Sequence, residues 1–435
     1  MKRKSSLSTT VTLVLLTAAL TVSLTMLLAM RQFNDQLKMV GERQGMYEDV
    51  HDVDSLVRKY YPSIDDTLLR QSIAQGYVAG LGDPYAVYYT PARYAAEKLR
   101  MSGKANNVGV ILTLNADAVP VVSRVNKGSS ADKAGVKVGD VITAVDGDTV
   151  TGKPLADIQN QLNTAEKVRL TVQRGKESHA YELSSFEYTV RSVTTDVIDS
   201  IGYVRVTAFY DNTPDQFRSA VSALQEKGVT GMVFDLRNNA GGSPKAVQSM
   251  LDYVMPLGPY GTMTDVAGNI TILSVSDGNL LGVPTVTLVN GTTAGEAEFF
   301  AAVLQNASLT TVVGQTTAGK AKYQEYFTLE SDYSALKLTV GQYGLVNSKE
   351  TWQDVGVAPE VLVELPPEQA GMSGLLDPKD DQQVKVAIEQ ISGSDMNLLE
   401  NATTSTEPTE KTTEKTTKKT EKKTEKTTKK TTKKK

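Results

Sequence analysis

The sequence contains no cysteine and only two histidines among its 435 residues. Without cysteine the chain has no disulfide bond, no thiolate nucleophile and no cysteine-ligated metal site. His51 and His179 lie far in sequence from the polar turns described below, so a serine–histidine–aspartate site would need a long spatial return. A lone histidine is more often a surface or packing residue than a functional one. Cysteine chemistry is therefore excluded, and histidine chemistry is not expected.

The charge is distributed unevenly. Residues 401–435 hold twelve lysines and five glutamates, a net charge of +7, so the rest of the chain carries −11 within the overall −4. This segment consists mainly of Thr, Lys and Glu and cannot bury enough apolar surface to fold. We expect a disordered tail over residues 396–435. It either contacts an anionic cell-envelope polymer or lipid headgroups, or is simply solvated.

Residues 7–30 contain no charged side chain and follow three basic residues, Lys2, Arg3 and Lys4. The run is about long enough to span a bilayer. A cleavable secretory signal is the alternative, but the run is long for one and no clear A-x-A site closes it. We expect a cytoplasmic tip and a transmembrane anchor in residues 1–30, with the bulk of the chain outside the cytoplasm. The chain would then be a single-pass protein of the cell membrane.

Residues 31–100 have a helical pattern, with a capping signal at Ser63 to Asp66 and a Gly-Asp-Pro turn in GLGDPY. Residues 101–190 form a separate β-rich unit, in which AGVKVGDVI is followed by VDG. This unit resembles a PDZ domain. The resemblance implies that an extended peptide adds as a strand and that the backbone of Val108, Gly109 and Val110 holds its terminal carboxylate. The alternative is a module that only packs against the larger domain.

Residues 191–395 alternate strands and helices, as is typical of an α/β domain. The buried strand in GMVFDLRNNAGGS ends in polar residues and two glycines. Residues 285–324 read as strand, turn, helix, strand and turn, with polar groups in both turns. In open α/β sheets, ligands bind at such turns because they lie at the carboxyl ends of strands. We therefore expect the functional site of this domain there.

Together these segments resemble the carboxyl-terminal processing (tail-specific) serine peptidases. The resemblance covers roughly residues 53–391 and rests on GLGDPY, the PDZ-like unit, DLRNNAGG, GKAKYQ and VGVAPEVLVEL. It implies an α/β peptidase domain of crotonase-like ββα repeats with an inserted PDZ domain, beside the amino-terminal transmembrane helix and the disordered tail. It also implies a serine nucleophile with a lysine base, and neither a cofactor nor a metal.

The family's lysine falls on Lys320, and the glutamine that orients it falls on Gln324. A lysine accepts a proton only when uncharged, so burial has to lower its pKa. By the same resemblance, backbone N–H groups of Gly241 or Gly242 and of Glu296 would form an oxyanion hole. One such donor is worth about 3 kcal/mol in a transition state.

The nucleophile position departs from the family pattern. The serine position falls on Gly295, and residues 290–307 contain no serine. Thr292, Thr293 and Ser243 are the alternative hydroxyls nearby, but catalysis tolerates only small misplacements of the attacking atom. A glycine offers no nucleophile.

Two further expectations concern the lysine turn. Glu296 is expected to pair with Lys320, which would raise the lysine pKa and oppose a role as base. Residues 314–321, GQTTAGKA, nearly match a phosphate-binding loop, but Ala321 lacks the magnesium-binding hydroxyl and the next residues read as a strand instead of a helix. A nucleotide site is therefore not expected.

Two functions compete. The family resemblance predicts a membrane-anchored serine-type endopeptidase, a hydrolase outside the cytoplasm, that receives unfolded carboxyl-terminal tails from its PDZ domain. The residue at position 295 favours a pseudopeptidase that binds peptides or regulates a partner protease. Peptide tails and the membrane are the expected partners, nucleic acid is not, and a homo-oligomer stays open.

Overall fold

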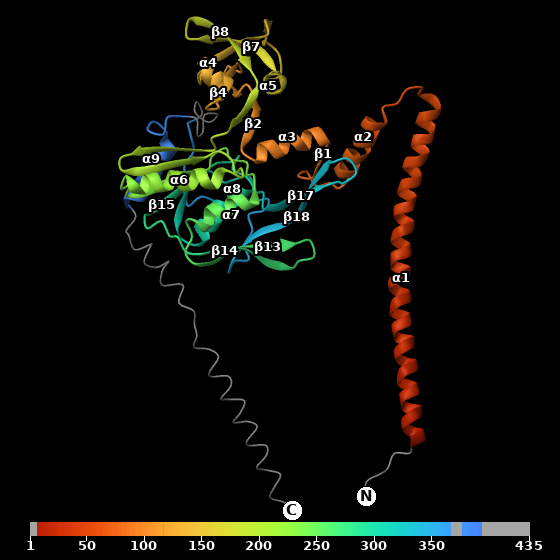
Figure 1. Cartoon of the computed structure of the whole chain (residues 1–435). Coiled ribbons are helices and arrows are strands. Elements are labelled where there is room, and N and C mark those ends of the chain that lie inside the picture. The colour runs from red at the N-terminus through yellow and green to blue at the C-terminus, as the bar shows by residue number, and fades with distance from the viewer. Residues whose placement is uncertain (1–6, 116, 367–375, 394–435) are drawn as a thin grey trace, which may run out of the picture. The chain divides into compact units, whose positions relative to one another are not determined.

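The computed structural model describes residues 7–115, 117–366 and 376–393 (Figure 1). The chain divides into two compact units, Met1–Tyr77 and Val78–Lys435. The predicted tail over residues 396–435 lies outside the described residues, so its disorder stays a prediction.

The first unit is helical. It contains α1 (Leu7–Tyr60) and most of α2 (Asp66–Ala79). Arg58, near the end of α1, bonds to Asp66 at 2.6 Å, and the Asp65 carboxylate caps α2 by accepting backbone N–H bonds from its first turn. The capping signal read from the sequence therefore marks the beginning of this helix.

The apolar residues of the predicted anchor lie on α1, which continues to Tyr60 without a break. Within the part of the chain that the structure describes, no helix is both long enough and apolar enough to cross a membrane. The transmembrane helix predicted in residues 1–30 is therefore not supported by the structure.

The region predicted to be helical up to residue 100 contains a strand. β1 (Val87–Tyr89) lies between α2 and α3 (Pro91–Met101) in the chain and pairs with β18 (Ala335–Leu345) of the larger α/β domain. The helical prediction is wrong here because the Gly-Asp-Pro turn ends α2, and valine and tyrosine suit a half-buried pleated surface. Helix α3 then begins afresh, with Thr90 as its cap and Pro91 in its first turn.

The PDZ domain is inserted through a two-stranded stem. β2 (Lys104–Asn107) carries the chain in, and β9 (Phe186–Thr189) pairs with it antiparallel as the chain leaves. Between them lies a six-stranded sheet of order β3-β4-β5-β7-β8, with β6 paired to β5. Its elements are β3 (Val110–Leu114), β4 (Pro120–Val125), α4 (Ser130–Ala134), β5 (Val141–Val145), β6 (Asp148–Thr149), α5 (Leu155–Thr164), β7 (Lys167–Arg174) and β8 (Glu177–Ser184).

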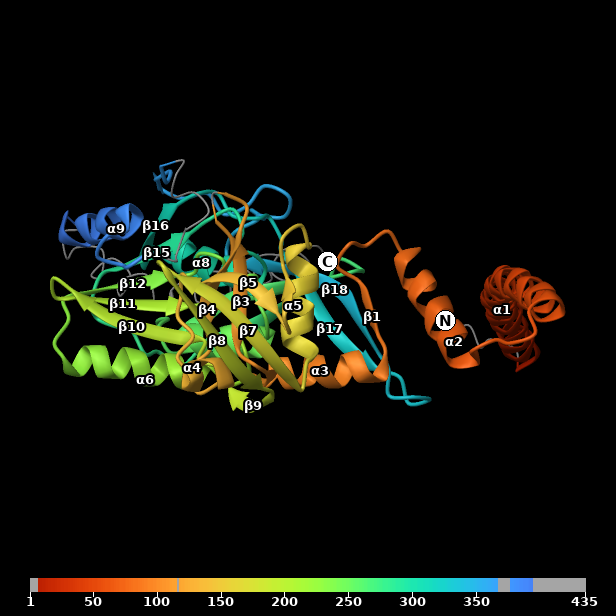
Figure 2. The same ribbon diagram turned by 90° about the horizontal axis from the view of Figure 1, so that it is seen from above.

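The larger α/β domain is built on a six-stranded sheet of order β10-β11-β12-β15-β16-β19, and Figure 2 shows its strands β10 to β16 following one another in this order. All neighbours pair parallel except β10 and β11. The strands are β10 (Val193–Ile198), β11 (Ile201–Val206), β12 (Gly231–Asp235), β15 (Thr285–Val289), β16 (Thr310–Gly314) and β19 (Val361–Leu362). The helices are α6 (Thr213–Glu226), α7 (Pro244–Asp252), α8 (Glu296–Asn306) and α9 (Gln382–Gly393).

Each face of this sheet has its own core. Val204 and Phe234 point to one face, where they pack with the apolar residues of α6, α7 and α8. Their neighbours Tyr203 and Val233 point to the other face and pack with α9. This alternation follows from the period of two in a strand. Helices on both faces bury the parallel sheet, as the α/β reading of the sequence requires.

A second, antiparallel sheet has the order β1-β18-β13-β14, with β17 also paired to β18. Its remaining strands are β13 (Gly258–Asp265), β14 (Ile270–Ser276), β17 (Lys322–Thr328) and β18 (Ala335–Leu345). Because β17 begins two residues after Lys320, this sheet fixes the lysine turn. The domain is thus mixed α/β, and its description as crotonase-like repeats stays a prediction.

Candidate functional site

The turn at Gly295 lies at the carboxyl end of the parallel sheet. β15 ends at Val289, and α8 begins directly after Gly295. Gly295 has φ 63° and ψ −120°, a conformation that other residues rarely adopt. A Cβ atom added there would have the Ala240 carbonyl oxygen at 3.8 Å and Lys320 Cδ at 4.0 Å as its nearest neighbours. The turn therefore has room for a side chain beside Lys320, but carries none.

Lys320 and Gln324 are brought together as the sequence predicts. Lys320 Nζ donates a hydrogen bond to Gln324 Oε1 at 2.9 Å and lies 4.7 Å from the centre of the Tyr85 ring. Gln324 Nε2 donates in turn to the Tyr85 carbonyl oxygen at 2.7 Å. The amide of Gln324 therefore orients the lysine, and Tyr85 from the GLGDPY turn completes the arrangement.

The pKa of Lys320 lies below its usual value. Burial is the main cause because desolvation penalises the charged amine, and the Lys337 ammonium acts in the same direction. The carboxylates of Glu296, Asp83 and Glu298 oppose this effect without outweighing it. Glu296 still raises the pKa of Lys320 by its charge, but the net shift is downward and the Glu296 carboxylate bonds to other partners, so the expectation that it pairs with the lysine and raises its pKa overall is wrong.

The Glu296 carboxylate accepts a hydrogen bond from a predicted oxyanion donor. Its Oε2 accepts from the Gly242 N–H at 2.8 Å, and its Oε1 accepts from the Tyr343 hydroxyl at 3.1 Å. Burial and the Glu296 charge raise the pKa of Tyr343, so this phenol stays protonated and donates. The Gly241 N–H donates to Asn239 Oδ1 at 2.9 Å. Both glycine donors thus already bond to acceptors of the chain itself.

Glu298 binds the two turns of the site together. Its buried carboxylate accepts from the N–H groups of Gly295 at 2.9 Å and Lys320 at 2.8 Å through Oε2. Its other oxygen accepts from the Gly319 N–H at 2.7 Å and the Thr317 hydroxyl at 2.5 Å. Four donors compensate the desolvation of one carboxylate. Because they come from both turns, Glu298 fixes Lys320 relative to Gly295.

The same bonds explain why GQTTAGKA is not a phosphate-binding loop. Two of its N–H groups, those of Gly319 and Lys320, already hold the Glu298 carboxylate. The loop leads into strand β17 and not into a helix, as the sequence indicates. A phosphate-binding loop needs free N–H groups at the beginning of a helix.

Two of the three alternative hydroxyls, those of Thr293 and Thr292, donate hydrogen bonds to other acceptors. Thr293 is fully buried and donates to a backbone carbonyl oxygen at 2.9 Å. Thr292 Oγ1 donates to Asn238 Oδ1 at 2.9 Å. Ser243 directly precedes α7 and is 5% exposed. Within the described residues, none of these three hydroxyls bonds to Lys320 Nζ.

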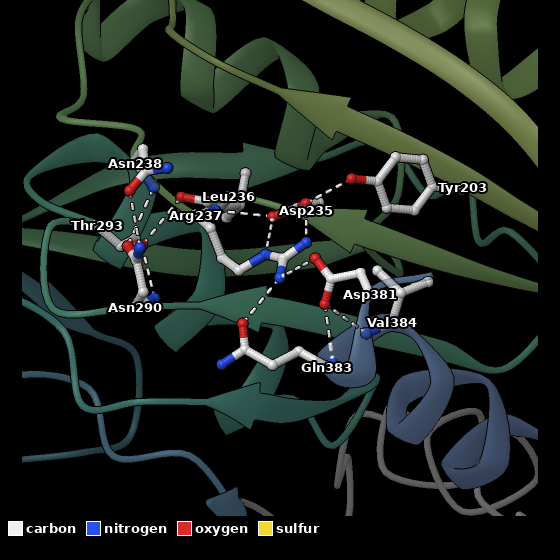
Figure 3. A network of polar contacts seen from close by, with 10 residues as sticks. All are labelled: Tyr203, Asp235, Leu236, Arg237, Asn238, Asn290, Thr293, Asp381, Gln383 and Val384. Carbon is white, nitrogen blue, oxygen red and sulfur yellow. Dashed lines mark hydrogen bonds and ion pairs between the residues drawn. The ribbon is translucent and has the colours of Figure 1, made fainter. Parts of the chain in front are cut away.

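A buried ionic network lies where strand β12 ends (Figure 3). Arg237 is 1% exposed, and its guanidinium bonds to Asp235 at 2.7 Å and 2.9 Å. Nη1 donates to Asp381 Oδ2 and Gln383 Oε1, both at 2.8 Å, and the Tyr203 hydroxyl donates to Asp235 at 2.5 Å. The network therefore joins the end of β12 to the beginning of α9.

A second set of bonds, at the left of Figure 3, joins the turn after β12 to the turn after β15. The Asn290 amide donates to Asn238 Oδ1 at 2.8 Å, and the Asn238 N–H donates to Asn290 Oδ1 at 3.0 Å. The DLRNNAGG segment thus fixes the Gly295 turn through side chains as well as through its glycines. The sequence reading assigned this segment only backbone donors and missed the roles of Asp235 and Arg237.

In the PDZ domain, Gly109 lies in the predicted carboxylate loop with φ 88°. A Cβ atom there would lie 2.1 Å from Ser129 Cβ, so only glycine fits. Val108 and Val110 are buried, each 1% exposed, and place the loop against the domain core. Strand β3, which begins at Val110, forms one edge of the sheet. The three predicted residues therefore precede and begin an edge strand, where a peptide could add.

Other predicted features lie outside this site. His179 is on β8 of the PDZ domain and His51 is on α1, so neither belongs to an element that forms the peptidase site. Across residues 7–115, 117–366 and 376–393, no cluster of three or more His, Asp or Glu side chains is placed to hold a metal ion. Sequence reasoning missed the roles of Tyr343 and of the Glu298 carboxylate. The only signal in the sequence was the pair of acidic residues, Glu296 and Glu298, at the beginning of a helix.

Two family models match the chain. The model for peptidase family S41 matches residues 200–363, and a PDZ domain model matches residues 121–174. Carboxy-terminal processing protease CtpA of Bacillus subtilis (strain 168) is 30% identical over 317 residues, which are 71% of this chain and 66% of that protein. The chloroplastic C-terminal processing peptidase of Tetradesmus obliquus is 30% identical over 313 residues, 66% of this chain and 67% of that protein.

A CtpA-like serine protease of Staphylococcus aureus (strain N315) is 28% identical and is matched over 63% of its length. The chain thus spans about two thirds of the length of these curated relatives. A crystal structure of an S41 protease from Bacteroides fragilis has a TM-score of 0.57 and 19% identity, covering 79% of this chain and 97% of its own. That likeness shows the fold.

Fold and matches together define an α/β peptidase domain with an inserted PDZ domain. The chain belongs to the carboxyl-terminal processing peptidases of family S41.

Proposed function

We propose that this chain is a peptide-binding member of the family that does not hydrolyse peptides through a serine. One observation carries the proposal. Gly295 occupies the nucleophile position without a hydroxyl, while the neighbouring Glu296 carboxylate accepts the Gly242 N–H bond at 2.8 Å. A serine-type peptidase needs a hydroxyl at the first position and a free donor at the second. This chain has neither.

The position of Glu296 opposes catalysis by its charge as well. The tetrahedral intermediate of acyl transfer carries a negative oxygen that bonds to the oxyanion donors. Two unit charges about 4 Å apart repel by about 4 kcal/mol at an effective dielectric constant of about 20. Loss of one donor costs about 3 kcal/mol more. Both effects act in the transition state, so a hydroxyl alone would not restore full activity.

The PDZ domain supplies the binding part of the proposal. Its strand β3 forms one edge of the sheet, where an extended peptide tail would add, and the loop at Gly109 is shaped by glycine for a close approach of the ligand. We expect a peptide with a free carboxyl end to bind more tightly than the same peptide as its amide. Equal dissociation constants by fluorescence anisotropy would remove carboxylate capture from the proposal.

A cleavage assay tests the absence of hydrolysis. A quenched fluorogenic peptide with an unfolded carboxyl-terminal tail is incubated with the wild-type chain and with Lys320→Ala. We expect neither to exceed the rate in buffer. Cleavage by the wild-type chain that Lys320→Ala abolishes would contradict the proposal.

Serine-type peptidase activity is the second candidate, and the state of Lys320 favours it. Burial lowers the pKa of this lysine, and Gln324 orients its amine, as a general base requires. On this alternative another hydroxyl, from Thr292, Thr293 or Ser243, moves next to the amine when a peptide binds. The cleavage assay decides between the two, since only the second candidate predicts a loss on Lys320→Ala.

Membrane attachment and a location outside the cytoplasm are also part of the proposal. They rest on the basic residues before residues 7–30 and on the apolar character of that run. Contact of the lysine-rich tail with an anionic envelope polymer rests on its net charge alone. Addition of protease to intact cells tests the location, because a chain that survives until the cells are lysed would lie inside.

A further inference from the structure

The outer edge of strand β3 in the PDZ domain is already occupied. Gln159 of α5 extends its side-chain amide to this edge. Its Oε1 accepts from the Leu112 N–H at 2.8 Å, and its Nε2 donates to the Val110 carbonyl oxygen at 2.9 Å. One amide therefore satisfies a donor and an acceptor of the strand, which is what a peptide unit of an added strand does.

The alternation of the strand shows that these are the outward groups. The Gly109 carbonyl accepts from the Asn126 N–H, and the Ile111 carbonyl accepts from the Ser123 hydroxyl, both on the side of β4. Successive backbone groups of a strand point to opposite edges. The groups at positions 110 and 112 therefore point away from β4, toward α5.

The amide is held in this orientation. The second N–H of Gln159 Nε2 donates to Asn163 Oδ1 at 3.1 Å, one helical turn further along α5. Ile158 and Leu162 on the adjacent face of the helix are buried in the domain core, so α5 cannot withdraw easily. Gln159 is itself only partly buried. Its side chain can therefore leave the strand by rotation while the helix stays in place.

We propose that Gln159 is an internal substitute for the peptide, and that a peptide tail binds β3 only by displacing this amide. The proposal rests on the proposed capture of peptide tails and adds the residue that limits it. A ligand has to replace both hydrogen bonds of Gln159 at the groups where it would itself bond. Gln159 thus lowers the affinity for every extended peptide and favours those whose other contacts repay the exchange.

Binding measurements on the full chain test this. A library of random decapeptides with free carboxyl ends is selected on the wild-type chain and on Gln159→Ala, and the strongest binder is labelled for anisotropy. We expect Gln159→Ala to bind this peptide about three- to tenfold more tightly, since two modest competing hydrogen bonds are removed. Asn160→Ala, an exposed amide on the same helix, is the matched control and should leave the affinity unchanged.

Hydrogen exchange provides a readout that needs no ligand. In Gln159→Ala the Leu112 amide loses its acceptor and should exchange at least about tenfold faster, while the core amides of β7 and the melting temperature stay unchanged. Unchanged exchange at Leu112, or equal affinities in the two variants, overturns the proposal. If no peptide binds either variant although exchange at Leu112 rises, peptide capture fails while the closure of the edge by Gln159 stands.

Discussion

Replacing Arg237 with methionine tests the buried network of Figure 3. Methionine keeps much of the side-chain volume but removes the charge that neutralises Asp235 and Asp381. Both carboxylates are fully buried, so they would be left as uncompensated charges. Breaking a buried ion pair by removing one partner costs about 3–5 kcal/mol. We expect this loss in the free energy of unfolding of the peptidase domain.

The chain carries its own reporter for this measurement. Its single tryptophan, Trp352, is 4% exposed and belongs to the peptidase core, so its fluorescence follows the unfolding of this domain in urea. Arg218→Met is the matched control. Arg218 is about half exposed and lies 3.7 Å from Asp215, so its loss should cost less than about 1 kcal/mol.

The pH dependence of this loss of stability can also be predicted. Burial is the largest single influence and would raise the pKa of Asp235, but the charge and hydrogen bonds of Arg237, together with Arg205 and Tyr203, hold this pKa below its usual value. A carboxylate of this kind stabilises the fold above its unfolded pKa of about 3.9, and the contribution is lost as the pH falls through the lower folded value. The difference in the free energy of unfolding between wild type and Arg237→Met should therefore become smaller below about pH 4. A loss under about 1 kcal/mol at pH 7, or a gap that widens in acid, would refute the reasoning.

Two further predictions concern the site and the PDZ loop. By NMR of methylated amines, the Lys320 amine should titrate at a lower pH than the other lysines. Glu296→Gln should lower its pKa further, because the Glu296 charge raises this pKa. A pKa equal to that of free lysine would contradict the burial argument. Gly109→Ala should destabilise the PDZ domain by more than Gly175→Ala, since both have positive φ but only Gly109 would bring a Cβ atom within 2.1 Å of another residue. Equal shifts in melting temperature for the two variants would contradict this, because they would mean that the Gly109 loop accommodates the Cβ atom without loss of stability.

Much of the fold follows from local patterns. The short apolar runs of β11, β12 and β15 are typical of strands buried on both faces. The Thr-Pro beginning of α6 and the Gly-Asp turn of the PDZ domain likewise indicate their elements without reference to the rest of the chain. The strand at Val87–Tyr89 does not, because three residues form a strand only when β18 lies beside them. Its prediction needed knowledge of the tertiary partner.

Part of the candidate site could likewise be predicted from the sequence, and part could not. The resemblance placed Lys320, Gln324 and Gly295 by their spacing, and the structure brings them together. The partner of Glu296 could not be read from the sequence, because Gly242 lies 54 residues away and bonds through its backbone. An acidic residue next to Lys320 in space was expected to pair with it, but a carboxylate bonds first to the donors that lie in its reach.

The most direct test of the account compares Gly295→Ser with the double variant Gly295→Ser/Glu296→Ala in kcat/KM on a tail peptide. A Cβ atom at position 295 has room beside Lys320, so a serine there would carry its hydroxyl near the lysine, and the backbone strain at φ 63° is common to both variants. Only the double variant frees the Gly242 N–H for an oxyanion. The account predicts that the wild-type chain is inactive and that the double variant exceeds the single one by about 100-fold or more. Equal activities of the two variants, or an active wild-type chain, would contradict it.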